Sequence, residues 1–403
     1  MLSPKQQEYL QNCNHRWNIK VGATGSGKSW LDYAMVIPKR VIACRGEGTI
    51  VLLGNTRGTV SRNIIDPMRE IWGSTLVSGI HSDSTITLFG KKAHVLGADN
   101  KKHVARIQGM TIEYGYGDEM TTWSDDVFQM LKSRLRCPHS VYDGTCNPDS
   151  PHNYVKKFLD SNADIFCQSS TIDDNPFLPP EFVAALKQEY AGTVYYDRFI
   201  LGRWALAEGR IYDMFDRQKH VVSSVERPYT AFYISMDYGT QNPTAMLLWG
   251  KCNGVWYAVK EYYYSGREQK QQKTDEEYYT DLVKLAGSRA IRSVIIDPSA
   301  ASMIACIKRH GHFHVKPADN TVLDGIRNTA TALNSGAIFI CDCCERTIGE
   351  FESYVWDEKA AERGEDKPIK ENDHAMDAMR YFVQTILRSA KVKTSNRYTL
   401  GIY

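Results

Sequence analysis

The sequence feature that most constrains the fold is the glycine-rich stretch Gly22-Ala23-Thr24-Gly25-Ser26-Gly27-Lys28-Ser29. It fits G-x-x-x-x-G-K-[ST] in full, after a short apolar segment and before a helical one. Glycines at positions 22, 25 and 27 let backbone amides turn toward phosphates. Lys28 is expected to reach the β- and γ-phosphates, and Ser29 to bind Mg²⁺. The motif predicts a P-loop ATP site on a parallel sheet.

A P-loop needs an acidic partner at the end of a later strand. Asp118-Glu119, which follows the segment 112–117, is the best candidate. We expect Asp118 to hold the magnesium ion and Glu119 to polarise the attacking water. Glycines and tyrosines interrupt the preceding strand, where bulky aliphatic residues are usual.

Several polar residues are further candidates for the nucleotide site. Gln6 lies just upstream of the loop, where a side-chain amide could read the adenine edge, and Gln7 is a near-equal alternative. Thr145 and Asn147 follow a strand at 141–145, where polar groups can sense the γ-phosphate. The transition state also requires an arginine, and the candidates are Arg106 and Arg57.

The order of the apolar segments predicts two domains of different class. Residues 1–205 alternate strands and helices, as in a parallel sheet with crossovers, with a strand at 49–54 and a helical region at 181–203. Residues 206–228 are expected to be a linker. Residues 229–403 then give a three-strand meander (232–237, 245–249 and 255–259), a helix near 275–285, strands at 293–297 and 337–340, and a last helix from about 373. The prediction is therefore an α/β protein with a P-loop NTPase domain and a ribonuclease H-like domain.

Three aspartates mark the expected chemistry of the second domain. Asp237 ends the first strand of the meander, Asp297 ends a later strand, and Asp377 opens the last helix. Carboxylates from adjacent strand ends and a covering helix can converge on one point, and such oxygen ligands suit two Mg²⁺ or Mn²⁺ ions. His374 lies three residues before Asp377 on the same helix face, whereas Asp373 is expected to point elsewhere.

Composition limits the location of the protein but identifies no partner. The 403 residues carry a net charge of +2, so DNA contacts would need local basic patches. There is no apolar run long enough to span a bilayer and no secretory signal, which predicts no membrane association and a cytoplasmic location. The ten cysteines are interpreted as reduced thiols, including the cluster Cys341, Cys343 and Cys344, which lacks a partner pair at zinc-ribbon spacing.

Two smaller features have plain interpretations. His310, His312 and His314 alternate as on a strand and are expected to form its solvated face. The basic residues near the C-terminus could contact DNA or a protein partner, and the preferred interpretation is a disordered, solvated end; they are Arg388, Lys391, Lys393 and Arg397.

Together, these motifs resemble the terminase large subunits of tailed phages and prophages, and look closest to the group related to the defective prophage of Bacillus. The resemblance is carried by the P-loop, Asp118-Glu119, the segment 145–148, Asp237, Asp297 and His374-x-x-Asp377, and by the interdomain segments 201–204 and 209–215. The chain departs from many relatives at Thr24, where they carry an arginine.

The resemblance implies ATP-driven packaging of double-stranded DNA into a procapsid, with metal-dependent cleavage of the DNA at initiation and termination. It implies as partners a small terminase subunit, a portal protein and a ring of large subunits, commonly a pentamer, in the cytoplasm of the bacterial host. The ATPase residues would be Lys28, Ser29, Asp118 and Glu119. The nuclease metal ligands would be Asp237, Asp297 and Asp377, with His374 beside them.

Two other classes of protein fit parts of the sequence. A P-loop helicase or repair ATPase with a DNA-binding C-terminal half would leave the three aspartates of that half without a role. A transposase- or resolvase-like nuclease with an accessory nucleotide switch would turn over little ATP. Parallel assays of ATP hydrolysis and metal-dependent plasmid cleavage distinguish the three.

Overall fold

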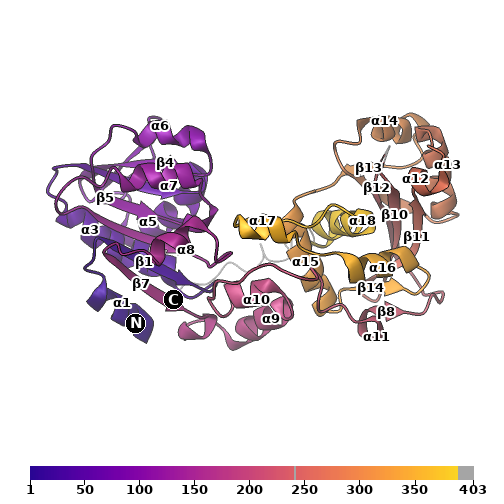
Figure 1. Ribbon diagram of the computed structural model, residues 1–403, viewed down its shortest axis with the longest axis horizontal. Helices are drawn as coiled ribbons and strands as arrows, with labels where there is room; N and C mark the ends of the chain where they lie inside the picture. Colours follow the sequence, from indigo (N-terminus) through magenta and orange to yellow (C-terminus); the bar gives the residue numbers. More distant parts are fainter. Residues whose placement is uncertain (240–241, 389–403) are drawn as a thin grey trace. The chain divides into compact units, whose positions relative to one another are not determined.

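The computed structural model describes residues 1–239 and 242–388, which divide into two compact units. The N-terminal unit comprises Met1–Ala184, Val194–Leu206 and Glu362–Glu365. The C-terminal unit comprises Ala185–Thr193, Ala207–Ala361 and the described residues from Asp366. In both units a β-sheet is packed against helices (Figure 1).

The sheet of the N-terminal unit has the strand order β3-β4-β2-β5-β6-β1-β7. All neighbouring strands are parallel except β3 and β4. The strands are β1 (Trp17–Gly22), β2 (Thr49–Gly54), β3 (Thr85–Leu88), β4 (Lys91–Gly97), β5 (Ile112–Gly117), β6 (Val141–Cys146) and β7 (Ile165–Ser170). Every residue of β1 and β5 is buried, as expected when helices cover both faces of a parallel sheet.

Two apolar cores lie on opposite faces of this sheet. Successive residues of β2 enter different cores, Ile50 and Leu52 on one face and Val51 on the other. The helical segments up to Phe199 are α1 (Pro4–Asn12), α2 (Lys28–Leu31), η1 (Asp32–Val36), α3 (Ile37–Ala43), α4 (Arg57–Val60), η2 (Ser61–Ile65), α5 (Asp66–Trp72), η3 (Lys101–His103), α6 (Val104–Ile107), η4 (Met120–Thr122), α7 (Asp125–Lys132), α8 (Tyr154–Leu159), η5 (Ile172–Asp174), α9 (Pro180–Tyr190) and α10 (Val194–Phe199). The helical region expected at 181–203 is thus two helices, separated by a turn in which Gly192 has a φ of +70°. The residues of α9 from Ala185 belong to the C-terminal unit.

The sheet of the C-terminal unit has the order β13-β12-β9-β10-β11-β14-β8. Its strands are β8 (Val221–Val222), β9 (Ala231–Asp237), β10 (Thr244–Cys252), β11 (Val255–Tyr264), β12 (Ile291–Ile296), β13 (Val315–Pro317) and β14 (Ile338–Cys341). β10 is antiparallel to both β9 and β11, and the other neighbours are parallel. The run β11-β10-β9-β12-β13 has the order of a ribonuclease H-like fold, which confirms the predicted fold class.

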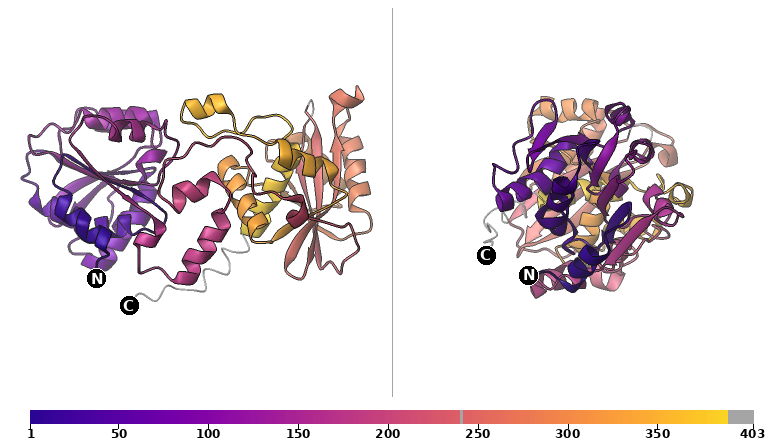
Figure 2. Two further views of the ribbon diagram at one scale, coloured as in Figure 1. Left: turned by 60° about the horizontal axis from the view of Figure 1, so that its bottom comes forward. Right: turned by 90° about the vertical axis from the view of Figure 1, so that its left-hand side faces the viewer.

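The helical segments of this part of the chain are α11 (Arg217–His220), α12 (Gly266–Gln269), α13 (Asp275–Ala286), α14 (Ala301–His310), α15 (Val322–Asn334), α16 (Glu345–Ser353), α17 (Glu358–Glu362), α18 (His374–Phe382) and η6 (Val383–Arg388). Helix α18 packs against β9, β10 and β12 (Figures 1 and 2). Phe382 of α18 stacks on Trp249 of β10 with ring centroids 4.1 Å apart. This contact fixes the helix over the strands that carry the aspartates.

Two expectations need correction, those for the segment 206–228 and for the three histidines at 310–314. The segment 206–228 is not a free linker, because its residues from Ala207 belong to the C-terminal unit, β8 pairs with β14, and Phe215 stacks on Phe351. The strand expected at 337–340 is confirmed as β14, which lies beside β11, while the place beside β12 is taken by β13. His310, His312 and His314 do not share a strand, since His310 is the last residue of α14 and His314 precedes β13.

No helix within residues 1–239 and 242–388 has the length and apolar character needed to cross a membrane. Lys391, Lys393 and Arg397 lie outside the described residues. Arg388 is described, is exposed and lies 4.0 Å from Asp324.

Candidate active sites

The P-loop connects the buried strand β1 to helix α2. Gly25 and Gly27 have φ values of +75° and +83°, which L-residues with a side chain rarely adopt. A Cβ on Gly22 would lie 2.2 Å from Ser170 Oγ. Glycine is therefore required at these positions by backbone conformation and by the close approach of β7, and Lys28 then begins the helix.

Lys28 is the central cation of this site. Its Nζ donates to Gly22 O at 2.9 Å, to Ala23 O at 2.7 Å and to Asn147 Oδ1 at 3.1 Å. Burial lowers the pKa of Lys28 to about 8. The side chain is thus held against the loop, and Asn147, which directly follows β6 (Val141–Cys146), contacts it.

Asp118 and Glu119 follow β5, and Thr145 lies on β6, which separates β5 from β1. Thr145 Oγ1 donates to Asp118 Oδ1 at 3.1 Å, and Asn63 Nδ2 donates to Asp118 Oδ2 at 3.2 Å. Burial raises the pKa of Asp118, with these hydrogen bonds offsetting part of the effect. Burial and the charge of Asp118 also raise the pKa of Glu119, which has a positive φ of 52°. A non-glycine residue in this conformation marks a strained backbone of the kind found at functional sites.

A cavity of 310 Å³ lies between these groups. Its walls include most of the predicted nucleotide residues; the residues that line it are Thr24, Gly25, Ser26, Gly27, Lys28, Ser29, Trp30, Tyr33, Asp118, Glu119, Thr145, Cys146 and Asn147. The structure thus brings together the loop, the acidic pair and the end of β6, which are widely separated in the sequence.

The two glutamines differ in their contacts. Gln6 is buried and its Nε2 donates to Gly27 O at 3.2 Å, whereas Gln7 is exposed and donates to Leu2 O. Sequence analysis missed Asn175, whose Nδ2 donates to Gly25 O at 2.6 Å. It also missed Asn63, because an amide on an intervening helix leaves no motif in the sequence.

Neither predicted arginine is among the described residues that line the cavity. Arg106 is exposed on α6, and Arg57 is exposed and donates to Ser84 Oγ at 3.2 Å. The charge of Arg62, another exposed arginine, acts on Glu119 and lowers its pKa, although less than burial raises it.

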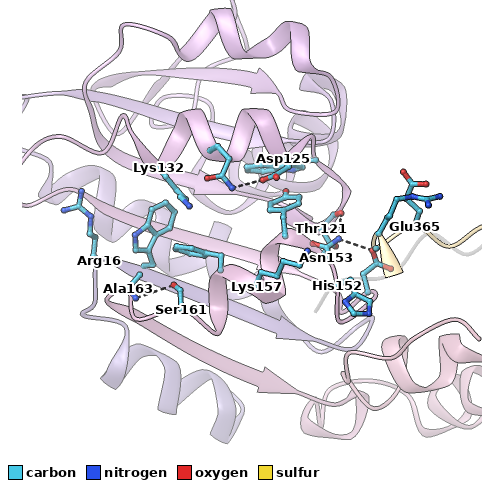
Figure 3. Close-up of a pocket in the computed structure, with 18 residues that line it drawn as sticks. Arg16, Thr121, Asp125, Lys132, His152, Asn153, Lys157, Ser161, Ala163 and Glu365 are labelled. Carbon is cyan, nitrogen blue, oxygen red and sulfur yellow. Dashed lines mark hydrogen bonds between the residues drawn. The ribbon is translucent and has the colours of Figure 1, made fainter. Parts of the chain in front are cut away.

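A larger cavity, of 840 Å³, lies elsewhere in the N-terminal unit (Figure 3). Basic and aromatic side chains line it, among them Arg16, Lys132, Lys157, Trp123 and Phe158. None of the predicted site residues lines this larger cavity among those the structure describes. Its wall is nevertheless connected to the smaller cavity, because its lining residue Thr121 donates to the backbone oxygen of Asn147 at 3.1 Å.

The second site is at one edge of the C-terminal sheet. Asp237 ends β9 and Asp297 follows β12, and these neighbouring strands are parallel, so the two carboxylates emerge at the same edge. The hydroxyl of Tyr381, on α18, lies 3.4 Å from Asp237 Oδ1 and 3.2 Å from Asp297 Oδ2. One hydroxyl proton is therefore shared between two carboxylates, and sequence analysis did not find this tyrosine.

Asp237 and Asp297 differ in their surroundings. Burial raises the pKa of Asp237, a shift that the hydrogen bond from His374 only partly offsets. Burial also acts to raise the pKa of Asp297, but hydrogen bonds from Ser299 and Asn320 lower it overall. The site thus combines a carboxylate whose charge is poorly compensated with one that stays ionised.

His374 is placed by Asp237 and by the start of α18. Its Nδ1 lies 2.9 Å from Asp237 Oδ2. Burial alone lowers the pKa of His374, but the hydrogen bond and charge of Asp237 raise it overall. Glu350, which sequence analysis also missed, accepts hydrogen bonds from the backbone nitrogens of Ala375 and Met376 at 2.7 and 3.1 Å. It thereby holds the first turn of α18 and the direction of His374.

Asp377 is engaged by cations rather than by the other aspartates. It forms an ion pair with Arg380 and lies 3.5 Å from Lys370 Nζ. Asp237, Asp297 and Asp377 do not form a set in which all ligand atoms lie within 4.8 Å of one another in the described chain. Asp373 does not point away from the site as expected, because it is buried and lies 3.3 Å from the same lysine nitrogen.

These two units define the class of the protein: a P-loop NTPase joined to a ribonuclease H-like domain with a carboxylate site. The family model for the N-terminal domain of the T4-like virus type of terminase large subunit matches residues 19–219. The large terminase subunit of Escherichia phage T5 is 24% identical over 200 residues, which are 46% of this chain and 44% of that protein. The match thus spans less than half the length of this curated relative.

Solved structures of the large terminase from a thermophilic bacteriophage match nearly the whole chain. The form in complex with ADP is 40% identical with a TM-score of 0.83, and the alignment covers 96% of this chain and 100% of that one. The form in complex with ATP-γ-S is 41% identical with a TM-score of 0.82 and the same coverage. The chain therefore belongs to the phage terminase large-subunit family.

Proposed function

We propose that the N-terminal unit hydrolyses ATP to move double-stranded phage DNA into a procapsid, and that the C-terminal unit cuts the DNA concatemer with divalent metal ions. The observation that carries this proposal is the presence in one chain of a P-loop cavity closed by an acidic pair and of an acidic sheet edge covered by a helix. Family membership supports the combination of the two activities.

In the nucleotide site, the glycine-rich loop and Lys28 bind the phosphates of ATP, and Ser29 and Asp118 hold Mg²⁺. The cavity fits this role, because the half-buried Lys28 and two glycines in the left-handed conformation line it together with two carboxylates. Glu119 polarises the attacking water, and its raised pKa suits a general base.

Three further roles complete the nucleotide site. Thr145 and Asn147 sense the γ-phosphate, since one contacts Asp118 and the other contacts Lys28. Gln6 reads the adenine from its position against Gly27. Arg106 remains a candidate for the transition-state arginine, together with Arg57 and Arg62, whose charge acts on Glu119.

In the nuclease site, Asp237, Asp297 and Asp377 would hold two Mg²⁺ or Mn²⁺ ions. Bound metal ions would supply a nucleophile from water and stabilise the leaving oxygen of the phosphodiester. The carboxylate oxygens of Asp237 and Asp297 suit such ions, because both lie next to the Tyr381 hydroxyl at one sheet edge. Asp377 would have to exchange its ion pair with Arg380 for the metal. His374 orients Asp237 and carries protons, and Tyr381 holds Asp237 and Asp297 at one point.

As a terminase large subunit, the chain would act with a small terminase subunit and dock on the portal as a homo-oligomeric ring, commonly a pentamer, in the cytoplasm of the bacterial host. The assignment of the motor to the N-terminal unit, in place of residues 1–205, and of the nuclease to the C-terminal unit, which extends residues 229–403 to include those from Ala207, is part of the same proposal.

The full-length chain tests this function in three parallel assays: ATP hydrolysis, plasmid cleavage with Mg²⁺ or Mn²⁺, and protection of DNA from external nuclease in the presence of procapsids and small subunit. We expect Lys28→Ala to abolish ATP hydrolysis and DNA protection while plasmid cleavage persists. A wild-type chain that turns over ATP but cuts no DNA with any divalent ion would instead support a helicase-type ATPase. Cleavage without ATP turnover would support a nuclease with a nucleotide switch.

A further inference from the structure

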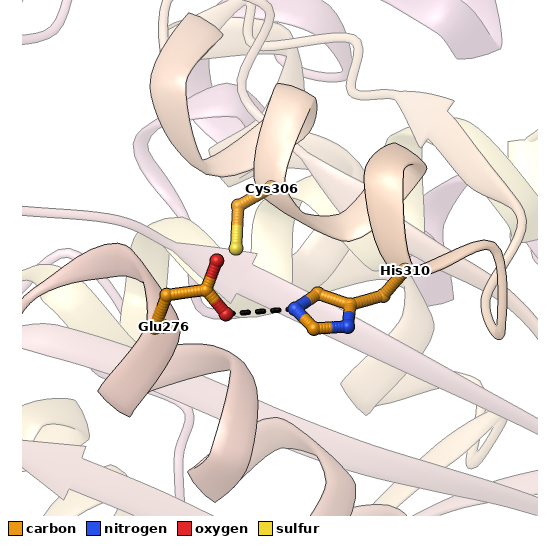
Figure 4. Close-up of side chains that lie close together, drawn as sticks. All are labelled: Glu276, Cys306 and His310. Atoms are coloured by element: carbon orange, nitrogen blue, oxygen red, sulfur yellow. Dashed lines mark hydrogen bonds and ion pairs between the residues drawn. The ribbon is translucent and has the colours of Figure 1, made fainter.

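Helices α13 and α14 of the C-terminal unit bring together three side chains of mixed chemistry, away from the carboxylate site. Glu276 lies in the first turn of α13, and Cys306 and His310 lie on α14 (Figure 4). Each of the three offers one ligand atom, and these atoms all lie within 4.8 Å of one another. Among the residues that the structure describes, no other set of His, Cys, Asp and Glu side chains meets this condition.

The geometry of α14 explains why its two residues share one side. Cys306 and His310 are four residues apart and therefore face the same direction. The helix ends directly after His310, because Gly311 has a φ of +69° and closes it in the left-handed conformation. Cys306 is 2% exposed, so its thiol forms the inner wall of the cluster, while Glu276 and His310 form its outer rim.

The imidazole of His310 is held in a fixed orientation. Its Nε2 lies 2.7 Å from Glu276 Oε2. The ring of Tyr279, also on α13, stacks on the imidazole with centroids 3.8 Å apart and planes within 7° of parallel. Tyr279 leaves the histidine little freedom to rotate, so the ligand nitrogen faces Glu276 before any ion arrives.

We propose that Glu276, Cys306 and His310 form a binding site for a transition-metal ion of borderline softness, with Zn²⁺ as the natural occupant. A thiolate, an imidazole and a carboxylate are the ligands that Zn²⁺ takes in proteins, and a water molecule would complete a tetrahedron. Mg²⁺ and Ca²⁺ prefer sites made of oxygen atoms alone, which this cluster does not provide. The site therefore differs in chemistry from the proposed nuclease site and is independent of the function proposed for it.

Binding requires two local changes. The Cys306 thiol loses its proton to solvent as the sulfur becomes a ligand. Arg309, which forms an ion pair with Glu276, must release the carboxylate; its side chain is 68% exposed and can turn into solvent. The metal then takes the place of the arginine charge beside Glu276.

The ion would connect the two helices that flank the acidic sheet edge. The backbone nitrogen of Ser299 donates a hydrogen bond to Asp297 Oδ1 at 2.7 Å and so forms a turn after the strand. Helix α14 starts directly after this turn, a few residues beyond Asp297. Asp275, next to Glu276, accepts a hydrogen bond from the hydroxyl of Tyr238, the residue after Asp237. A metal between α13 and α14 would thus brace the segments that carry both carboxylates.

The test uses the full-length chain, stripped of metal and titrated with Co²⁺ as a spectroscopic substitute for Zn²⁺. We expect one equivalent of Co²⁺ to produce a thiolate charge-transfer band and the d–d bands of tetrahedral coordination, both of which Zn²⁺ abolishes and excess Mg²⁺ leaves unchanged. Saturating Zn²⁺ should raise the Tm by about 5 °C, the size expected for a ligand that binds only the folded chain.

Matched variants decide whether these three side chains are the ligands. Cys306→Ser should remove the charge-transfer band, and His310→Ala and Glu276→Gln should each weaken Zn²⁺ binding by at least about tenfold. Cys343→Ser is the control, because Cys343 is an exposed free thiol in the same unit. Since Glu276 and His310 are exposed, their variants should fold even if Cys306→Ser does not. A wild-type chain without a thiolate band, or variants that bind Zn²⁺ as tightly as the wild type, would overturn the proposal.

Discussion

The two candidate active sites differ in the groups that hold their charged side chains. In the N-terminal site, the Lys28 ammonium is surrounded by neutral oxygens, and Asp118 accepts hydrogen bonds from a hydroxyl and an amide. In the C-terminal site, Asp377 is paired with Arg380, and Asp237 is paired with His374. The first site leaves its cation available to an anionic ligand. The second holds its carboxylates with protein donors that a divalent cation would have to compete with.

This difference leads to different expectations for the two sites. The P-loop is positioned by its own backbone, so single side-chain changes there should alter binding and turnover separately. The carboxylate site depends on several side chains from different elements, so loss of one should remove the activity as a whole.

The largest effect is expected for the carboxylates at the strand ends. Asp237→Asn and Asp297→Asn should each lower metal-dependent plasmid cleavage by about a thousandfold or more, because each removes a charge needed to hold the metal ions. ATP turnover should stay within about twofold of wild type, since the P-loop belongs to another core. Initial rates of both reactions on the same preparations provide the measurement. Asp213→Asn is the control, because Asp213 is 69% exposed and forms an ion pair with nearby Arg210. Normal cleavage by both Asp237→Asn and Asp297→Asn would show that the nuclease assignment is wrong.

Glu119→Gln should separate binding from turnover in the other site. The amide keeps the size of the side chain but cannot accept a proton, so ATP hydrolysis should fall by about a hundredfold or more. Nucleotide affinity should change by no more than about twofold, because Lys28 and the loop are intact. Phosphate release and equilibrium binding of a fluorescent nucleotide measure the two quantities. Glu47→Gln is the control, because it makes the same chemical change at a side chain that is 54% exposed. Wild-type ATP turnover in Glu119→Gln would show that Glu119 does not act in hydrolysis.

An effect of intermediate size is expected for the pH dependence of nucleotide affinity, because Lys28 changes its charge near pH 8. Its pKa of about 8 lies below the usual lysine value, so the free chain loses the ammonium charge as the pH rises through 8. Because phosphate binding favours the charged form, nucleotide affinity should be full below pH 8 and should fall by about tenfold between pH 7 and pH 9. The Kd measured across this range in the wild type and in Gln6→Ala should show the same slope. An affinity that stays constant up to pH 10 would contradict the lowered pKa.

The smallest effect concerns the base of the nucleotide. Gln6→Ala should weaken ATP binding by about fivefold, the contribution of one hydrogen bond, and should reduce the preference for ATP over GTP. Gln7→Ala should leave both unchanged, because Gln7 is exposed and donates only to Leu2 O. A reduced preference for ATP over GTP in Gln6→Ala would show that Gln6 recognises adenine. Weaker binding with an unchanged preference would show that Gln6 only supports helix α1. If both variants keep the wild-type preference, neither glutamine reads the base.

Much of the fold could be predicted from local sequence patterns. The strands at 49–54 and 141–145, the meander and the helix near 275–285 were found because buried strands and amphipathic helices have distinct periodicities. The segment 206–228 was misjudged, because its buried aromatic residues contact Phe351, which lies far along the chain. A composition rich in polar residues between two domains does not reveal such a contact.

The sequence by itself determined the residue types that chemistry demands at short spacing: the P-loop, the acidic pair after β5 and the aspartates at strand ends. Only the tertiary structure decided which distant groups meet them. Tyr381 shares its proton between Asp237 and Asp297, and Cys306 and His310 meet Glu276 across two helices. The physical reason is that backbone geometry sets the spacing within one element, whereas the packing of separate elements sets the contacts between them.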